Sequence, residues 1–534
     1  MPSDCIPFRD TTYFSSLICD YLDEHPHLKP FYHRFPTLEN FKAQIEEKQR
    51  FFDHNNRKDL VHSLMKQYEG LSISSATLTN IDLLKGHTTF TVTTGHQLNL
   101  FTGPLYFFYK IVSTINLCKE LKTNYPEYNF VPVYWMATED HDFEEINHFN
   151  FNGKKIQWNR SSSGAVGELD LEGLEDVFKV FATQLGLSSN AKTLQQLFKD
   201  AYLNHKNLTE ATRYLVNELF KINGLVIIDG NDPVLKRLFI PYIKEELVKQ
   251  EAFNLISETN QQINALPNQQ YKIQVNPREI NLFYLHNNLR ERIVELDGKY
   301  SVFGMDRSWT QTEILSEVEE FPERFSPNVI FRPLYQEVIL PNLCYIGGGG
   351  EIAYWLQLKS NFEAQRVPFP MLLLRNSALI ITQKQQDKLD KLQMSVADLF
   401  LNQTDLMTKV TKQISNINID FSEQKAHLKK QFEDLYKLAE QTDKSFKGAV
   451  AAQEVKQLKG LENLEKRLLK AQKRKLEDVL ERVCQLQDEL FPRQSLQERN
   501  ANFSEFYLEY GEQFTQLLLQ NLQPLKGEFL ILTV

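Results

Sequence analysis

Two polar clusters in this chain carry the residue types that could do chemistry. The first is Thr94-Gly95-His96-Gln97, whose imidazole could donate to charge that develops on a phosphate. The second is Glu139-Asp140-His141-Asp142, in which three carboxylates and an imidazole fall within four residues. Such carboxylates could hold the ammonium group of an amino acid, bind Mg²⁺ that accompanies a nucleotide, or act as the base for an attacking amine.

Each cluster also has an ordinary structural interpretation. His96 and Gln97 could merely satisfy the backbone of a loop, and the acidic block could be a solvated loop that caps the next helix. A zinc site is a weaker interpretation of the second cluster, because alternating Asp and His without cysteine is poor evidence for zinc. Residue types alone leave these alternatives open.

Both clusters follow segments that predict neighbouring strands of a parallel sheet. Residues 89–94 are a β-branched run that ends at Gly95, and residues 130–137 are apolar almost throughout, as expected of a strand covered on both faces. Between them, Gly103-Pro104 precedes an apolar segment that predicts a helix. Because ligands bind outside the carboxyl ends of parallel strands, we expect both clusters in one cleft.

A run of four glycines, Gly347 to Gly350, precedes an amphipathic helical segment and would allow close approach of the backbone to an anion or an adenine ring. The run lacks the Lys-Ser/Thr ending of a P-loop and the G-x-G-x-x-G spacing, so it is equally compatible with a simple turn. Arg332 and Gln336 precede it and could reach the same cleft. No role is assigned to three further arginines, which we expect at the surface or in ion pairs: Arg278, Arg290 and Arg292.

The rest of the chain predicts an interrupted sheet and then a long helical arm. Further strands are expected at 224–229, 328–331 and 370–374, with a β-hairpin at 281–303 that turns at Asp297-Gly298. The expected divisions are a core with a helical N-terminus (1–150), a first insertion (151–223), core (224–270), a second insertion (271–326), core (327–383), a coiled-coil arm (384–490) and a return segment (491–534). The last eight residues are strand-like.

In the arm, apolar residues recur at the spacing of a coiled-coil seam. They are Leu428, Phe432, Leu435 and Leu438, then Leu461, Leu464, Leu468 and Ala471, and then Leu476, Val479, Val483, Leu486 and Leu490. The longer step after Ala471 suggests a local shift of the seam. An antiparallel helical hairpin, whose halves meet around residues 445–452, is the simplest interpretation.

Composition narrows the classes of protein. The 534 residues should form two or three packed units, and 42% hydrophobic and 12% aromatic residues predict a folded chain. A formal net charge of −9 argues against nucleic acid as a partner. The five cysteines are far apart and never in a Cys-x-x-Cys pair, so we expect neither disulfides nor zinc. Without a signal peptide or an apolar span of about 20 residues, a cytoplasmic protein with no membrane partner is expected.

Taken together, the separated motifs resemble those of the BshC family, the cysteine-adding enzymes of bacillithiol biosynthesis. The resemblance extends over essentially the full length, including Ser495 to Arg499 beyond the arm. The motifs that carry it are Thr94-Gly95-His96-Gln97 with Phe101 to Tyr106, Pro132 to Phe143 with its Glu-Asp-His-Asp block, and Arg332 to Gln336 with Leu340-Pro341.

The resemblance implies an α/β fold in which a Rossmann-like parallel-sheet core carries connecting-peptide insertions and a C-terminal coiled coil supports a homodimer. It implies addition of L-cysteine to the amine of glucosamine-malate, which forms bacillithiol. By similarity to class I synthetase-like ligases, ATP, with Mg²⁺ as an optional companion, would activate the cysteine carboxylate as an adenylate for attack by the amine.

The site residues follow from these roles. We expect three catalytic residues: His96, Asp140 and His141. Substrate contacts are expected from Thr94, Gln97, Glu139, Asp142, Arg332 and Gln336. Nucleotide contacts are expected from Gly95, Gly103, Gly347, Gly348, Gly349 and Gly350.

The chain also departs from the class I pattern. It has Thr-Gly-His-Gln where those ligases carry His-x-Gly-His, it has no Lys-Met-Ser-Lys-Ser equivalent, and no Cys/His set could hold the substrate thiol on zinc. Adenylation therefore rests on analogy of fold. Two other classes remain: a non-catalytic coiled-coil interaction protein, and a metal-dependent hydrolase or transferase that uses Asp140, His141 and Asp142.

Overall fold

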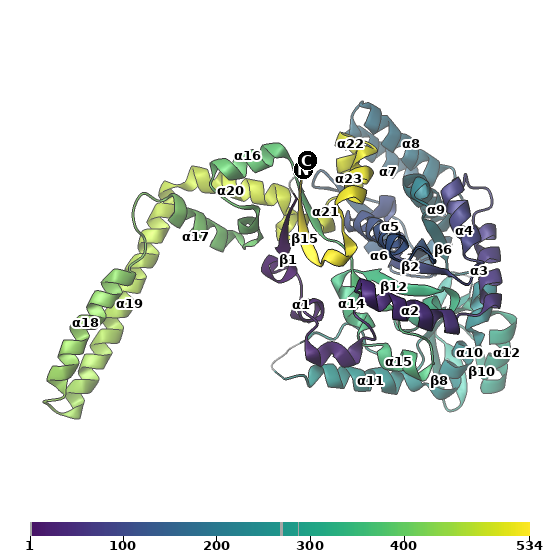
Figure 1. The fold of residues 1–534 in the computed structure, drawn as a ribbon, viewed down its shortest axis with the longest axis horizontal. Coiled ribbons are helices and arrows are strands. Elements are labelled where there is room, and N and C mark those ends of the chain that lie inside the picture. The colour runs from purple at the N-terminus through teal and green to yellow at the C-terminus, as the bar shows by residue number, and fades with distance from the viewer. Residues whose placement is uncertain (1–2, 268–270, 287) are drawn as a thin grey trace. The chain divides into compact units, whose positions relative to one another are not determined.

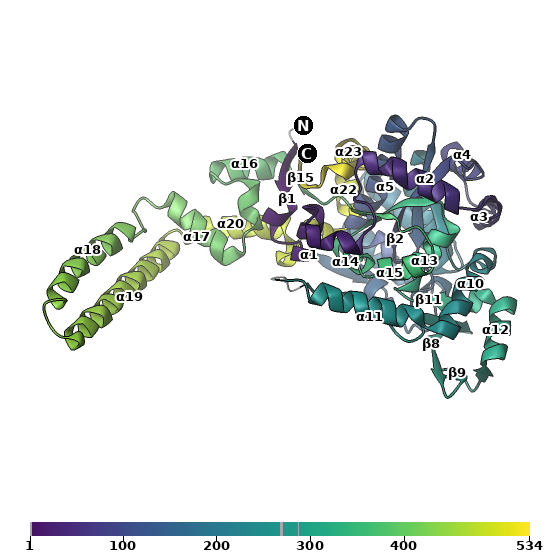
Figure 2. The same ribbon diagram turned by 60° about the horizontal axis from the view of Figure 1, so that its bottom comes forward.

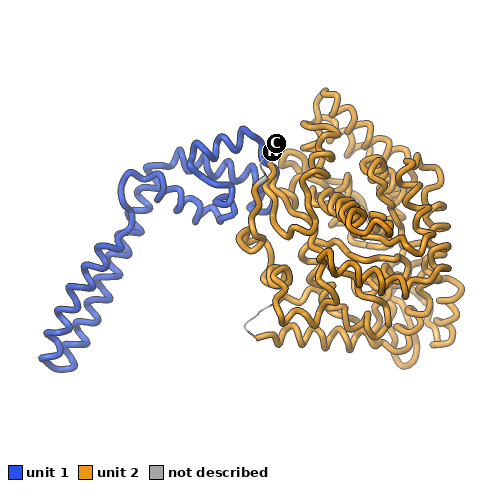
Figure 3. The backbone as a smooth tube through the Cα atoms, in the orientation of Figure 1, with its two compact units in different colours: residues 1, 380–496, 533–534 blue, residues 2–379, 497–532 orange. Residues whose placement is uncertain are grey.

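The computed structural model describes residues 3–267, 271–286 and 288–534, and it separates into two compact units. Residues 3–379 and 497–532 form the larger unit, and residues 380–496 with 533–534 form the smaller one (Figure 3). The expected boundary at residue 270 falls outside the described residues. No helix in the described part of the chain combines the length and the apolarity needed to cross a membrane.

A five-stranded parallel sheet forms the core of the larger unit, in the order β13-β12-β2-β3-β6 (Figure 1). The strands are β2 (Thr89–His96), β3 (Asn129–Met136), β6 (Val226–Asp229), β12 (Asn342–Gly347) and β13 (Met371–Leu374). Side chains on both faces of β2 and β3 are buried, as their apolar sequences require. The expected Rossmann-like α/β core is therefore confirmed.

In the core of the larger unit, one predicted strand is wrong, and one strand of the parallel sheet was not predicted. Residues 328–331 were expected to be extended, but the strand there is β11 (Phe325–Pro327), and helix α13 (Phe331–Ile339) begins immediately afterwards. The Asn328 side chain caps this helix, because its Oδ1 accepts from the backbone N–H groups of Ile330 and Phe331. Strand β12, between β13 and β2, had no sequence prediction.

Helices pack around this sheet, and α5 (Tyr106–Asn124) is the crossover between β2 and β3. Its buried residues Leu117 and Leu121 share a core cluster with Phe90, Val92 and Leu343 of the strands. The other helices of the larger unit are α1 (Ser16–Leu22), α2 (Leu38–Phe51), α3 (His54–Gln67), α4 (Ser75–Leu83), α6 (Phe143–Ile146), α7 (Leu174–Leu185), α8 (Ser189–Leu203), α9 (Leu208–Phe220), α10 (Pro233–Lys249), α11 (Glu251–Asn264), α12 (Gln311–Glu320), α14 (Gly349–Trp355), α15 (Lys359–Ala364), α21 (Gln497–Asn500), α22 (Phe503–Tyr510) and α23 (Gln513–Asn521).

Both insertions contain antiparallel strands. The first opens with the hairpin β4 (His148–Phe151) and β5 (Lys154–Gln157) and continues into α7, α8 and α9. The second builds a sheet in the order β10-β9-β8-β7-β11, from β7 (Leu282–His286), β8 (Leu289–Leu296), β9 (Lys299–Val302), β10 (Ser308–Thr310) and β11. The predicted turn is confirmed: Leu296 pairs with Lys299, and Asp297 and Gly298 have φ of 52° and 77°, as a two-residue hairpin turn requires.

A separate three-stranded sheet contains the strand-like C-terminus. Strand β15 (Glu528–Thr533) pairs antiparallel with β1 (Ser3–Pro7) and lies between β1 and β14 (Ala378–Ile381). The predicted terminal strand is thus present, and it belongs to the sheet with β1 and β14 rather than to the parallel sheet. The five cysteines are all unpaired, and Cys19, Cys118 and Cys344 are buried.

The smaller unit is helical, as predicted. Its helices are α16 (Gln383–Lys391), α17 (Gln403–Ile414), α18 (Ser422–Ala439), α19 (Lys444–Lys475) and α20 (Glu477–Leu490). Figures 1 and 2 both show α18 and α19 side by side as a hairpin. The helix break at Leu476 accounts for the longer step in the apolar spacing after Ala471.

The hairpin differs from the prediction in its turn and in part of its seam. The turn lies before residue 444, not at 445–452, because the Asp443 side chain accepts from the N–H groups of Ser445 and Phe446 and starts α19 there. Phe432 is buried against Val450, but Leu435, Leu438 and Leu464 are exposed by 40%, 52% and 53%. The last three therefore do not pack inside the hairpin.

Candidate active site at the carboxyl ends of the parallel strands

A cavity of about 910 Å³ opens where β2, β3 and β12 end, with strands of the second insertion on its other side. Parallel sheets bind ligands at this edge, and the volume is sufficient for a nucleotide with a small substrate. Seven cationic side chains and four carboxylates line the cavity, although the whole chain carries a formal charge of −9. The site is therefore locally positive.

The structure brings most of the predicted site residues together. Those that line the cavity are Gly95, His96, Gln97, Glu139, Asp140, His141, Arg332, Gly348, Gly349 and Gly350. Those that do not line it are Thr94, Gly103, Gln336, Gly347 and Asp142. Thr94 instead ties β2 to β12, since its Oγ1 donates to the Ile346 carbonyl at 2.7 Å.

One wall of the cavity is acidic and is organised by Gln97. The Nε2 of Gln97 donates to Asp140 Oδ2 at 2.7 Å and to Glu145 Oε2 at 2.9 Å, so one amide holds two carboxylates together. The other oxygen of Asp140 accepts from the His141 N–H at 2.7 Å. Glu145, rather than Asp142, which does not line the cavity, is the second carboxylate of this wall. An ammonium group placed there would find several acceptors.

Glu139 has a different environment from Asp140, although the two are adjacent. Its Oε1 lies 2.5 Å from the Nζ of Lys236, which is completely buried and also donates to the Phe325 carbonyl at 2.7 Å. This pair joins the loop after β3 to helix α10 and strand β11. The charge of Glu139 is thus already compensated, whereas Asp140 and Glu145 have no ion pair with Lys or Arg among the described residues.

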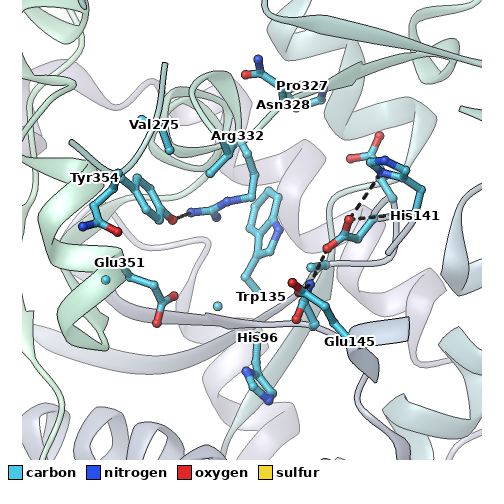
Figure 4. A pocket seen from close by; sticks show the side chains of 18 of the residues that line it. His96, Trp135, His141, Glu145, Val275, Pro327, Asn328, Arg332, Glu351 and Tyr354 are labelled. Atoms are coloured by element: carbon cyan, nitrogen blue, oxygen red, sulfur yellow. Dashed lines mark hydrogen bonds and ion pairs between the residues drawn. The ribbon is translucent and has the colours of Figure 1, made fainter. Parts of the chain in front are cut away.

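His96 is held as a neutral imidazole. Its ring packs against Tyr106 and Phe107, and burial, with the nearby charge of Lys110, lowers its pKa to about 3. Figure 4 shows the ring extending away from Arg332 and Tyr354. Its Nε2 has no hydrogen-bond partner among the described residues. His96 can therefore offer a hydrogen bond, but it cannot supply a proton as an imidazolium near neutral pH.

His141 is exposed and contacts Arg290. An Nη1 of Arg290 lies 2.7 Å from His141 Nδ1, and because a guanidinium only donates, this nitrogen must accept. The ring proton then resides on Nε2. Arg290 was expected to be at the surface or in an ion pair, but it is half-buried and forms no ion pair with a described carboxylate. Arg278 and Arg292 are exposed, as expected, yet they line the mouth of this cavity.

A buried lysine that was not predicted braces the opposite wall. The Nζ of Lys110 donates to the Gly95 carbonyl at 2.8 Å and lies 2.5 Å from Glu351 Oε2. Glu351 also accepts from the Tyr345 hydroxyl at 2.6 Å and from the Gly348 N–H at 2.8 Å. Lys110 thus joins the loop after β2 to the glycine turn after β12. A single lysine within the apolar segment 105–118 was the available signal.

Arg332 lies between aromatic rings and points across the cavity (Figure 4). Its guanidinium carbon is 5.8 Å from the Trp135 ring centre and 5.6 Å from that of Tyr345, and its Nη1 donates to Gln336 at 3.0 Å. No described carboxylate forms an ion pair with it. Gln336, predicted to contact substrate, instead orients this arginine. Rigid support without a counter-ion suits Arg332 to bind an anionic ligand.

The described residues gather no group of three or more His, Cys, Asp or Glu side chains with the geometry to hold a metal ion. Asp140, His141 and Asp142 in particular do not converge, since Asp142 lies outside the cavity. The cavity therefore presents carboxylates, arginines and backbone rather than a cluster of metal ligands.

Residues 1–376 match the N-terminal Rossmann-like domain of bacillithiol biosynthesis BshC, and residues 378–534 match its C-terminal coiled-coil domain. The chain belongs to the BshC family. All cavity residues up to Arg375 fall in the segment matched to the Rossmann-like BshC domain, and Arg499 falls in the segment matched to the other.

BshC relatives match over nearly their whole lengths. A Flavobacterium johnsoniae protein named "Putative cysteine ligase BshC" is 61% identical over 534 residues, which covers 100% of both chains. Proteins of the same name from Christiangramia forsetii and Bacillus cereus are 59% and 29% identical, covering 100% and 95% of this chain and 99% and 95% of their own.

Proposed function

We propose that this chain is the ligase that joins L-cysteine to the amine of glucosamine-malate, with ATP activating the cysteine carboxylate. The observation that carries the proposal is one cavity in which two linked carboxylates, Asp140 and Glu145, face the arginine Arg332, which has no ion-pair partner among the described residues. An amine nucleophile and a polyphosphate need these opposite charges within reach of one another.

The first step would form a mixed anhydride. The carboxylate oxygen of cysteine attacks the α-phosphorus of ATP, and pyrophosphate leaves with the electron pair of the broken P–O bond. Arg332, with Arg375 and Arg499, which also line the cavity, would bind the phosphates together with the backbone of Gly348 to Gly350. Mg²⁺ would arrive with the nucleotide and neutralise part of its charge. His96 would stay neutral, as a hydrogen-bonding group of the Gly95 loop.

The second step would form the amide. The sugar amine attacks the acyl carbon, AMP leaves, and the proton lost by the amine passes to a carboxylate. We assign this base to Asp140, because it forms no ion pair with a described lysine or arginine, whereas Glu139 is paired with Lys236. Glu145 would help to hold the ammonium form of the amine before the proton leaves. The Gln97 amide holds the carboxylates of Asp140 and Glu145 close together.

The coiled-coil arm provides a second element of the proposal, a homodimer. Leu435, Leu438 and Leu464 are spaced as seam residues but remain exposed in the α18–α19 hairpin. A second copy could cover them. Light scattering of the purified protein should give twice the mass of one chain. The double variant Leu435→Glu/Leu438→Glu should have the mass of a single chain. A single-chain mass for the wild type would contradict this element.

A deletion strain tests the proposed function. Cells that lack the protein should accumulate glucosamine-malate and contain no bacillithiol, and the wild-type chain should restore the thiol. The His96→Ala/Asp140→Ala double variant, present at equal abundance, should not restore it. Normal thiol levels in the deletion strain would refute the function, and full rescue by the double variant would favour a non-catalytic role.

A further inference from the structure

The arginines of the cavity are unusual in having almost no counter-ions. Six arginines line it, and within the described residues only Arg375 forms an ion pair, with Glu498 at 2.7 Å. Guanidinium groups gathered without ion-pair partners of their own repel one another, which is costly unless a ligand supplies further negative charge. Arg332, Arg375 and Arg499 are accounted for by the phosphates of the proposed function, but Arg278, Arg290 and Arg292 are not.

Arg290 and Arg292 form a separate group on strand β8 of the second insertion. Residues two apart on a strand face the same side, and Phe283 of β7 lies between them, because it pairs in register with Arg292 and supports the Arg290 guanidinium at 4.0 Å from its ring centre. Arg290 is further fixed by His141 Nδ1 at 2.7 Å and Ser326 Oγ at 3.3 Å. These contacts use Nη1 and Nε, and no described residue accepts from Nη2.

The acidic wall lies beside this arginine pair, and the Arg332 group lies across the cavity. Figure 4 places His141 and Glu145 on one side of Trp135, and Tyr354 and Glu351 on the other. His141 connects Arg290 directly to the loop that carries Asp140. A ligand that reached both Asp140 and Arg290 would therefore carry an ammonium group and, close to it, one or more carboxylates.

We propose that Arg290 and Arg292 form a subsite for the carboxylates of the acceptor substrate, so that the enzyme selects an amino sugar bearing a dicarboxylic acid. This inference rests on the proposed function and adds the location of the acidic part of the acceptor. Burial lowers the pKa of the Arg290 guanidinium more than the nearby charges of Glu139 and Asp140 raise it, and a bound carboxylate would add to their compensation. A fixed, planar guanidinium also binds carboxylates in two-point fashion at little entropic cost.

Acceptor kinetics of the full-length enzyme test the subsite. Arg290→Gln and Arg292→Gln should each raise the KM for glucosamine-malate by about 10- to 100-fold, the worth of a charge-assisted hydrogen bond, and leave the KM values for ATP and cysteine within about twofold. The preference for glucosamine-malate over glucosamine should fall by the same factor. Arg290→Lys should restore part of it. The matched control is Arg237→Gln, an exposed arginine on α10 that lies outside the cavity.

Two kinetic results would overturn the inference. If the variants raised the KM for ATP and left the KM for glucosamine-malate unchanged, Arg290 and Arg292 would bind phosphates. If the variants behaved like Arg237→Gln, the two arginines would bind neither the phosphates nor the acceptor. Equal unfolding midpoints of the variants and the control would exclude a folding defect as the cause of any loss.

Direct binding separates this inference from the proposed function. Calorimetric titration of the wild-type chain should show that it binds L-malate, and that it binds L-lactate, which has one carboxylate, only weakly. Arg290→Gln and Arg292→Gln should each abolish malate binding, and Arg237→Gln should retain it. Malate binding of this kind in a chain without ligase activity would keep the subsite and refute the function. Ligase activity in a chain that binds no malate would refute the subsite alone.

Discussion

Lys110→Met should destabilise the larger unit and loosen the wall of the cavity. The substitution leaves Glu351 without its cation and the Gly95 carbonyl without a donor. Breaking a buried ion pair from one side costs about 3–5 kcal/mol. Glu351 is 26% exposed on its side chain and keeps hydrogen bonds from Tyr345 and Gly348, so we expect a loss near the lower end, about 3 kcal/mol.

Tryptophan fluorescence during urea unfolding measures this loss in the right part of the chain. All four tryptophans, Trp135, Trp158, Trp309 and Trp355, belong to the larger unit, so the signal does not report on the helical arm. This matters because a chain of two units need not unfold in one transition. The matched control is Lys119→Met, an exposed lysine on the same helix, which should cost less than about 0.5 kcal/mol.

The double variant Lys110→Met/Glu351→Gln measures how much of the loss comes from the unpaired charge of Glu351. Because it removes both charges, it should regain about 2 kcal/mol relative to Lys110→Met. A loss below about 1 kcal/mol for Lys110→Met, or a double variant no more stable than the single one, would refute the view that this pair braces the wall.

Three other substitutions have defined outcomes. Burial raises the pKa of Glu246 to about 7, so the folded chain holds this proton more tightly than the unfolded chain and loses stability as pH rises from about 4.5 to 7. Glu246→Gln should remove this pH dependence and raise the free energy of unfolding by about 2 kcal/mol near pH 8. Urea unfolding at both ends of the pH range measures the effect, and an unchanged pH dependence would contradict it. Gly230→Ala should cost about 1–3 kcal/mol and shift Trp135 emission, because the added Cβ would lie 2.4 Å from the Trp135 ring; an unchanged midpoint would refute this steric argument. Asp140→Asn should lower kcat by about 10²- to 10⁴-fold without changing the KM for ATP, and a wild-type kcat would exclude Asp140 as the base.

The predictable part of the fold is the part in which local sequence and tertiary structure agree. Strands β2 and β3 were recognised because their buried, β-branched or apolar runs end in polar residues, as strands of a covered sheet do. Residues 328–331 have the same local character, but the Asn328 side chain caps a helix there. β12 ends within the run of four glycines, which hid a strand that lies between two others.

The location of the site was predictable from the sequence, but most contacts between its side chains were not. The edge of the sheet followed from topology, so Gly95 to Gln97 and Glu139 to His141 were brought together as expected. Which carboxylate stays uncompensated depended on partners far along the chain: Lys236 for Glu139, and Gln97 for Asp140 with Glu145. No spacing rule in one sequence reveals such pairs.

Reconstitution of the reaction from purified components would show whether this chain ligates cysteine at the cavity. The purified chain, given ATP, L-cysteine and glucosamine-malate, should form the cysteinyl amide with one AMP and one pyrophosphate per amide, as measured by mass spectrometry and phosphate analysis. Asp140→Asn and Arg332→Gln should form it far more slowly. Absence of the amide from wild-type reactions, or its formation by both variants at the wild-type rate, would contradict the assignment of this cavity as the site of cysteine ligation.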